Sequence, residues 1–420
     1  MCVTRTKKCI GLFLLFIIPI ELIANELTLA EAEQLALDSD FIIKQYTARS
    51  ESLDELAIAD GQLPDPKIKL GIMNMPVDSF DRDQEPMTQL QFGVQQSFPR
   101  GKTLHYKRLR TEDIADVDQA KALEQEKKVL RSLRNSYLSL YLNVKTELTL
   151  QENRDLFTQL LDITQRQYAV GRDNQHDVLR AQLELALIDD RIAEITGEKE
   201  ISLAELAKWV GDISAQRPLP ESFPEINRLL GLDEIVSSLT SHPLIQVEDA
   251  VINAKDKNIK IAQEQYKPGW LFDLTYGQRS GNNLDGSSRD DFASVMLMVD
   301  LPLFTDKRQD KRLSASKLEH KASQYARTDR LLELKRQVEK EHANWLRLSK
   351  RLELYETRAV VDAEQNSEST LKAYQNDQTD FTTLMRARLT ELNIQLDMLR
   401  IRVNRAKSQA NLLYYSRDVI

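Results

Sequence analysis

The sequence predicts a mainly α-helical protein with a small β portion, built as two similar halves. Two stretches without glycine or proline, 102–170 and 303–420, predict long helices, because these residues cost a helix roughly 1 and 3 kcal/mol each. Four segments that alternate apolar and polar residues predict strands. The same order of elements occurs twice, which indicates a duplication rather than a short-period repeat.

Composition argues against several functional classes. The 420 residues include 57 basic and 65 acidic side chains, a net charge of −8, whereas nucleic-acid binding favours a basic surface. The five histidines lack the spacing of metal ligands, and no nucleophile elbow, phosphate-binding glycine loop or zinc-binding histidine pair occurs. We therefore expect no enzyme activity, no catalytic residues, no cofactor, no bound metal and no nucleic-acid partner.

Residues 1–24 have the features of a signal peptide. A basic region with Arg5, Lys7 and Lys8 precedes a short apolar run, and Ala24 is a plausible cleavage point. The apolar run is shorter than the ~20 residues of a spanning helix, so a retained anchor is the less favoured alternative. Cys2 and Cys9 would leave with the signal, so we expect an exported chain without disulfides.

The first repeat is predicted to span 25–210. Thr28 and Glu31 form a capping box that opens a short helix, and a second helix follows over 41–61. Strands are expected at about 67–76 and 87–97. A long helix then runs to Tyr168, turns at Gly171, where a left-handed residue is expected, and returns over 177–210.

A proline-containing connector, 211–231, leads to the second repeat, 232–420. Strands are expected at about 270–279 and 291–301, followed by the second pair of long helices. Phe98 and Phe304 are 206 residues apart, and the same shift relates Tyr168 to Tyr374. Each half thus has the order helix, β-hairpin, long helix and return helix.

The long helices and the strands both indicate assembly with further copies. Apolar residues recur every seven positions at Leu331, Val338, Trp345, Leu352 and Ala359, which is coiled-coil spacing. At 1.5 Å per residue, each long run would extend on the order of 100 Å. Four strands cannot close a barrel, which needs about eight. An exported chain with such strands must obtain the others from copies of itself.

Two groups of side chains allow alternative interpretations. By alternation, Met73, Met75, Met296 and Met298 lie on the polar strand faces, where they would be soft ligands for Cu(I) or Ag(I) or simply adaptable packing residues. Charged clusters on the long helices, such as Arg347, Lys350, Arg351 and Glu353, are predicted to be solvated faces.

The motif Tyr-x-x-Gly-x(5)-Asp-Val-Leu-x-Ala-Gln at 168–182, echoed at 374–388, resembles the TolC family of outer-membrane factors. The segments 63–66, 74–76, 87–88 and 96–102 resemble, more narrowly, the CzcC/CusC-type members that partner heavy-metal efflux pumps. This resemblance implies a homotrimer with a twelve-stranded β-barrel in outer-membrane lipid and a twelve-helix α-barrel that crosses the periplasm. It also implies two partners, a periplasmic adaptor and an inner-membrane pump of the RND type.

The resemblance further implies a periplasmic gate at the turns between the long helices. The family's acidic ring positions fall on Thr383 and Arg386, and its gate link falls on Asp177 and Thr379, where the basic partner is missing. Asp377 replaces the glycine of the second turn, and with Asp380 it could supply a displaced acidic ring. Tyr168 and Tyr374 close the long helices, as gate residues or as ordinary helix-end packing.

Taken with the resemblance, the sequence predicts a passive outer-membrane exit channel of a tripartite efflux system, with heavy-metal cations as the cargo. The fold expected is mainly α with a small membrane β-barrel portion. One alternative is the same duct serving drugs or secreted proteins. Another is a periplasmic coiled-coil scaffold without a pore, which would explain the helices but not the four strands.

Overall fold

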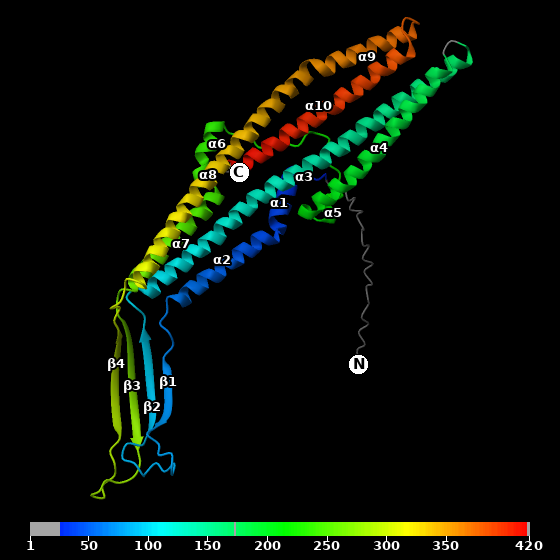
Figure 1. The fold of residues 1–420 in the computed structure, drawn as a ribbon. Helices are drawn as coiled ribbons and strands as arrows, with labels where there is room; N and C mark the ends of the chain where they lie inside the picture. The colour runs from blue at the N-terminus through cyan, green and yellow to red at the C-terminus, as the bar shows by residue number, and fades with distance from the viewer. Residues whose placement is uncertain (1–25, 172–173, 418–420) are drawn as a thin grey trace, which may run out of the picture.

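The computed structural model describes residues 26–171 and 174–417 as an elongated molecule with a helical bundle at one end and a sheet at the other (Figure 1). The predicted signal peptide and both cysteines therefore lie outside the described residues. The first half contains these elements: α1 (Leu29–Ser39), α2 (Phe41–Asp60), β1 (Lys67–Met73), β2 (Gln89–Phe98), α3 (Thr103–Ala169) and α4 (Gln175–Val210).

The second half repeats this order after the connector. It contains these elements: α5 (Asp212–Ala215), α6 (Leu232–Ser238), η1 (Leu239–Ser241), α7 (Pro243–Glu264), β3 (Gly269–Arg279), β4 (Phe292–Asp300), α8 (Gln309–Leu354), η2 (Tyr355–Ala359), α9 (Val360–Gln375) and α10 (Phe381–Tyr415). The helices α3 and α8 begin 206 residues apart, and α3 and α9 also end 206 residues apart. The predicted fold class, mainly helical with a small sheet, is confirmed.

The four strands form one antiparallel sheet in the order β1-β2-β3-β4. The register places Leu70 beside Phe92, Phe92 beside Tyr276, and Tyr276 beside Ala293. Since alternate residues of a strand point to opposite faces, the apolar residues of all four strands share one face of the sheet. Among the described strands, β1 and β4 each have one edge without a neighbour.

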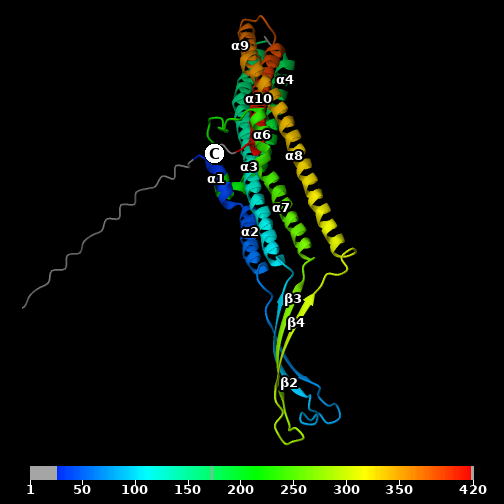
Figure 2. The same ribbon diagram turned by 90° about the vertical axis from the view of Figure 1, so that its left-hand side faces the viewer.

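Helix α3 is the centre of the helical bundle. It packs against α2, α4, α7 and α10 (Figures 1 and 2). Its middle part contributes Leu133 and Tyr137 to a core with Leu29 of α1 and Leu206 of α4. The buried Tyr137 hydroxyl donates to the carbonyl oxygen of Leu27 at 2.6 Å, so this core also holds the start of the described chain.

The predicted seam of α8 is largely inside the bundle. Val338 and Leu352 are buried, and Leu331, Trp345 and Ala359 are partly buried. The prediction that the helix begins at residue 303 was wrong, since residues 303–308 are not helical. The turn between α9 and α10 lies where the repeat predicts the second turn. In addition, the helical run contains a π-helical segment, η2, for which no glycine or proline gives a signal.

Candidate functional site

One face of the sheet is a continuous apolar surface that the described chain leaves exposed. Leu70, Phe92, Leu274 and Val295 represent the four strands, and each has about half or more of its side chain exposed. A contiguous apolar face of this kind marks a surface that meets lipid or another protein. The alternation of apolar and polar faces is also the pattern of a membrane β-barrel strand.

The opposite face of the sheet carries a polar cluster. Lys69 Nζ lies 3.0 Å from Asp273 Oδ2, and the Thr275 hydroxyl donates to Asp273 Oδ1 at 2.6 Å. Gly93 lies on the strand between them, and a Cβ there would be 2.7 Å from Thr275 Oγ1 and 3.4 Å from Lys69 Cε. This glycine therefore leaves room for Lys69 to cross β2 and reach Asp273 on β3.

Three of the four predicted methionines lie on this polar face. Met73 is opposite Gln89 on β1–β2, and Met296 and Met298 lie on β4 opposite Asp273 and Leu271. The placement of Met75 on the same face was wrong. Strand β1 ends at Met73, because Asn74 has a left-handed backbone with φ of 54°. Within one chain Met73 and the β4 methionines are at opposite edges of the sheet, so they are not brought together.

The junction between sheet and helices depends on Glu264, a contact that the sequence did not predict. This nearly buried carboxylate accepts the backbone N–H of Lys102 at 2.6 Å and the Lys267 ammonium at 2.8 Å. Burial alone would raise the pKa of Glu264, but these two hydrogen bonds outweigh it and hold the pKa below its ordinary value. The β2–α3 and α7–β3 connections are thus fastened to each other.

Gly101 makes that contact possible. Its φ of 49° lies in the left-handed region, and a Cβ at this position would be 1.9 Å from Glu264 Oε2. Next to it, the Arg100 guanidinium donates to the carbonyl oxygen of Gln265 at 2.7 Å. The segment Pro99–Lys102 was noted in the sequence only for its resemblance, and its physical role is this seating of the sheet on the helices.

The two turns at the far end of the bundle have matching backbones. Gly171 has φ of 78°, and Asp377, at the equivalent position, has φ of 58°. The two tyrosines differ, since Tyr374 is 6% exposed and Tyr168 is 47% exposed. Tyr374 donates its hydroxyl to Gln167 Oε1 at 3.0 Å and joins the cores of the two hairpins.

The remaining predicted gate residues are dispersed around these turns. Asp380 caps α10, since its carboxylate accepts from the Thr383 backbone N–H at 2.7 Å and from the Thr383 hydroxyl at 3.2 Å. These hydrogen bonds, the backbone one foremost, hold the pKa of Asp380 below its ordinary value. Arg386 is exposed on α10, and Asp177 is partly exposed in the first turn of α4. No hydrogen bond joins Asp177 to Thr379 in the part of the chain that the structure describes, and the gate roles stay predictions.

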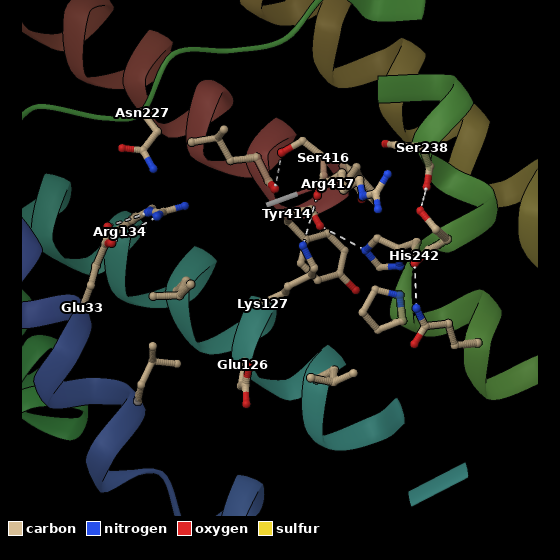
Figure 3. Close-up of a pocket in the computed structure, with 18 of the residues that line it drawn as sticks. Glu33, Glu126, Lys127, Arg134, Asn227, Ser238, His242, Tyr414, Ser416 and Arg417 are labelled. Atoms are coloured by element: carbon tan, nitrogen blue, oxygen red, sulfur yellow. Dashed lines mark hydrogen bonds and ion pairs between the residues drawn. The ribbon is translucent and has the colours of Figure 1, made fainter. Parts of the chain in front are cut away.

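A cavity of about 620 Å³ lies between α1, α3, α7 and the end of α10 (Figure 3). Glu33 and Arg134 form a two-bond ion pair on one side, and on the other His242 Nε2 contacts the carbonyl oxygen of Tyr414 at 3.0 Å. Lys127 donates to the carbonyl oxygen of Ser416 at 3.0 Å. The Lys127 and His242 contacts fasten the end of α10 to α3 and to the start of α7, and the Glu33–Arg134 pair joins α1 to α3, so all of these contacts have a structural role.

The described residues contain neither a membrane-spanning helix nor a cluster of metal-binding side chains. None of the described helices is both long enough and apolar enough to cross a bilayer. Within 26–171 and 174–417, no group of three or more His, Cys, Asp or Glu side chains could hold a metal ion.

Comparison with known proteins gives one family and a set of solved structures. Residues 235–415 match the outer membrane efflux protein family. No curated protein gives a significant match. The outer-membrane channel OprN is similar over 93% of this chain and 90% of its own, with a TM-score of 0.76 and 16% identity. The outer membrane protein VceC from Vibrio cholerae gives 0.76 and 17%, over 92% of this chain and 95% of its own.

CusC, a protein that forms a transmembrane channel, is similar over 94% of this chain and 93% of its own. Its TM-score is 0.75 and its identity is 12%. At these identities the structural likeness establishes the fold over nearly the whole chain. The match to the family model is independent of this structural likeness and covers the second half of the chain, from α6 to the end of α10.

Proposed function

We propose that this chain is an outer-membrane channel and that three copies of it form the exit duct of a tripartite efflux system. The match of residues 235–415 to the outer membrane efflux protein family and the structural likeness to the outer-membrane channel OprN support this. Three four-stranded sheets close into a twelve-stranded barrel in the outer membrane, and the long helices form a twelve-helix tunnel across the periplasm. A periplasmic adaptor joins the tunnel to an inner-membrane RND pump, which supplies the energy.

The sheet carries this proposal. Its apolar face is exposed, its other face is polar, and β1 and β4 each have an unpaired edge in the described chain. An open edge is not tolerated in a bilayer, because its backbone N–H and C=O groups would lack partners. Pairing β4 of one copy with β1 of the next satisfies both edges and surrounds a polar lumen.

The outer surface of α8 supports contact between copies along the tunnel. Leu318, Tyr325 and Leu332 are spaced by seven residues and are 65%, 64% and 63% exposed. After Glu339 at the next heptad position, the exposed apolar residues Leu346 and Leu354 of α8 and Val361 of α9 lie further along the same helical run. We call these six apolar residues the α8 stripe. Heptad spacing on an exposed face indicates a helix that packs against a further helix, here from the next copy.

For the cargo, we propose heavy-metal cations, with drugs as the alternative that the fold equally allows. The CzcC/CusC-like segments support the metal assignment, as do Met73, Met296 and Met298 on the polar face of the sheet. In a closed barrel these three methionines lie beside the seam between copies, since they are on β1 and β4, but at two levels: Met73 is level with Gln89 and Arg279, and Met296 with Asp273 and Gln95. Thioethers are ligands suited to Cu(I).

The cargo is tested in a deletion strain complemented with the triple variant Met73→Leu/Met296→Leu/Met298→Leu. We expect tolerance of copper and silver to fall while tolerance of zinc is unchanged, because leucine keeps the volume but removes the soft ligand. Met75→Leu/Met87→Leu, outside the strands, is the control and should behave as wild type. Unchanged copper and silver tolerance in the triple variant would show that these methionines do not contribute to metal export.

The duct itself is tested by electrical recording of the purified protein in planar lipid bilayers. We expect discrete current steps. A variant that cannot assemble, such as one with glutamate at three positions of the α8 stripe, should give none. Protein that inserts into the bilayer without any current would contradict a duct and favour a scaffold.

A further inference from the structure

A second hollow, of about 330 Å³, lies between α8 and α10 near the middle of the helical bundle. We call it the basic niche. Its lining residues are polar apart from one leucine, and they are Glu341, Asn344, Arg347, Leu348, Arg351, Asn404, Lys407, Ser408 and Asn411. Arg347 and Arg351 are exposed, as predicted for a solvated face, and they line this hollow together with side chains of α10.

The niche holds three cations without a carboxylate partner. Arg347 and Arg351 are one turn apart on α8, and Lys407 projects from α10. Within the described residues, none of the three forms an ion pair; Arg347 donates to Asn344 Oδ1 at 2.8 Å, and Lys407 donates to the Ser139 hydroxyl at 2.7 Å. The carboxylate of Glu341 accepts from the Ser408 hydroxyl at 3.1 Å. The niche is therefore net positive.

Lys407 is the least solvated of these cations. It is partly buried between α10 and α3, and this burial lowers its pKa, although nearby Glu205 opposes the shift. A half-desolvated ammonium gains more from a nearby anion than an exposed one does, because the local dielectric is lower. The ammonium also keeps donor capacity beyond its one hydrogen bond to Ser139.

The niche lies on the side of α10 that faces away from the connector. The opposite side of this helix meets the connector, where Gln409 donates to the carbonyl oxygen of Asn227 at 2.8 Å and Arg402 lies 6.0 Å from the Phe223 ring. Lys407 is about half a helical turn from Gln409, at roughly 100° per residue. With the connector on the outside of the proposed tunnel, the niche opens on its inside.

We propose that the basic niche binds an oxoanion group, such as a carboxylate, sulfate or phosphate, in the middle of the tunnel. The planar guanidinium groups of Arg347 and Arg351 match such a group with paired hydrogen bonds, and Lys407 adds a point charge. The side-chain amides of Asn404 and Asn411 supply neutral donors. The inference rests on the proposed function only for the position of the niche inside a tunnel.

The niche also bears on the form in which cargo passes. Three copies would place a ring of positive charge in the tunnel wall, and such rings select anions. Screening limits its reach to about 8 Å at physiological salt. Organic anions would be held briefly at this ring, and a metal ion would pass it as a complex with anionic ligands.

The test is calorimetric titration of the purified, detergent-solubilised full-length protein at low ionic strength. Inorganic phosphate and acetate are titrated separately, so that the phosphate and carboxylate arms are distinguished. We expect phosphate binding by the wild type, and binding at least about a hundredfold weaker in Arg347→Gln/Arg351→Gln, because each of the two lost charge-assisted hydrogen bonds accounts for about a factor of ten.

The control is Lys335→Gln/Lys372→Gln, which removes two exposed cations from the same helical run outside the niche. It should bind phosphate as wild type does. The proposal that the niche binds an oxoanion would be overturned by equal phosphate affinity in wild type and the Arg347/Arg351 variant, or by the absence of phosphate binding in the wild type. If the wild type conducts in bilayers but does not bind phosphate, only the proposed anion site is wrong. If it binds phosphate but does not conduct, only the proposed duct is wrong.

Discussion

Replacement of Leu318, Tyr325 and Leu332 with glutamate is expected to leave the protein monomeric. These residues are the most exposed part of the α8 stripe and pack against the next copy in the proposed tunnel. Burying three such side chains contributes roughly 5–9 kcal/mol per interface. Glutamate would remove that term and add unpaired charges, which are costly when buried.

The measurement is light scattering of the purified proteins, with circular dichroism to confirm that the helices are intact. The matched control replaces the same residues with methionine, phenylalanine and methionine, which keeps the stripe apolar and should keep the trimer. The side chains are exposed in the single chain, so the glutamate variant should still fold. A trimeric glutamate variant would show that α8 does not form the contact.

Gly101→Val is expected to be the most damaging single substitution at the junction of sheet and helices. A β-branched residue is strained at φ of 49°, and its Cβ would be 1.9 Å from the Glu264 carboxylate. Strain and the displaced hydrogen bonds of Glu264 together cost about 3 kcal/mol or more. We expect a lower melting temperature and less protein in the outer membrane.

Gly71→Val is the control for this prediction. Gly71 lies in β1, a Cβ added to it would meet no atom within 4 Å, and its φ is not positive. Its replacement should have little effect on the melting temperature. If Gly101→Val were as stable as Gly71→Val, the connection through Glu264 would not hold the sheet on the helices.

The long elements could be predicted because their signals are local. The absence of glycine and proline over 102–170 predicted α3, which spans Thr103–Ala169, and alternation predicted each strand to within a few residues. Gly171 was predicted as a left-handed turn residue, and its φ is 78°. The turn at Asp377 followed from the same repeat, without a glycine.

The rest could not be predicted because it depends on residues far apart in the sequence. Glu264 contacts the backbone of Lys102 across 162 positions, and only the folded chain brings Arg347 and Arg351 to the same hollow as Lys407. Met75 was placed on the strand because alternation continues past Met73, whereas the left-handed Asn74 ends it. The π segment that follows α8 has no breaker residue to reveal it.

The closure of the sheet by further copies is the central claim, and disulfide trapping across β4 and β1 tests it most directly. Leu70→Cys is combined in turn with Ala293→Cys, Val295→Cys or Leu297→Cys, all on the apolar face. Both native cysteines lie within the predicted signal peptide. Single-cysteine variants serve as controls, since one cysteine per chain links two copies at most.

We predict that oxidation of membranes carrying at least one of these pairs gives covalent products of two and three copies and none larger. Three copies then close the ring, and no free edge remains for a fourth. The absence of any cross-linked product from all three pairs, or a ladder that continues beyond three copies, would contradict a closed trimeric barrel.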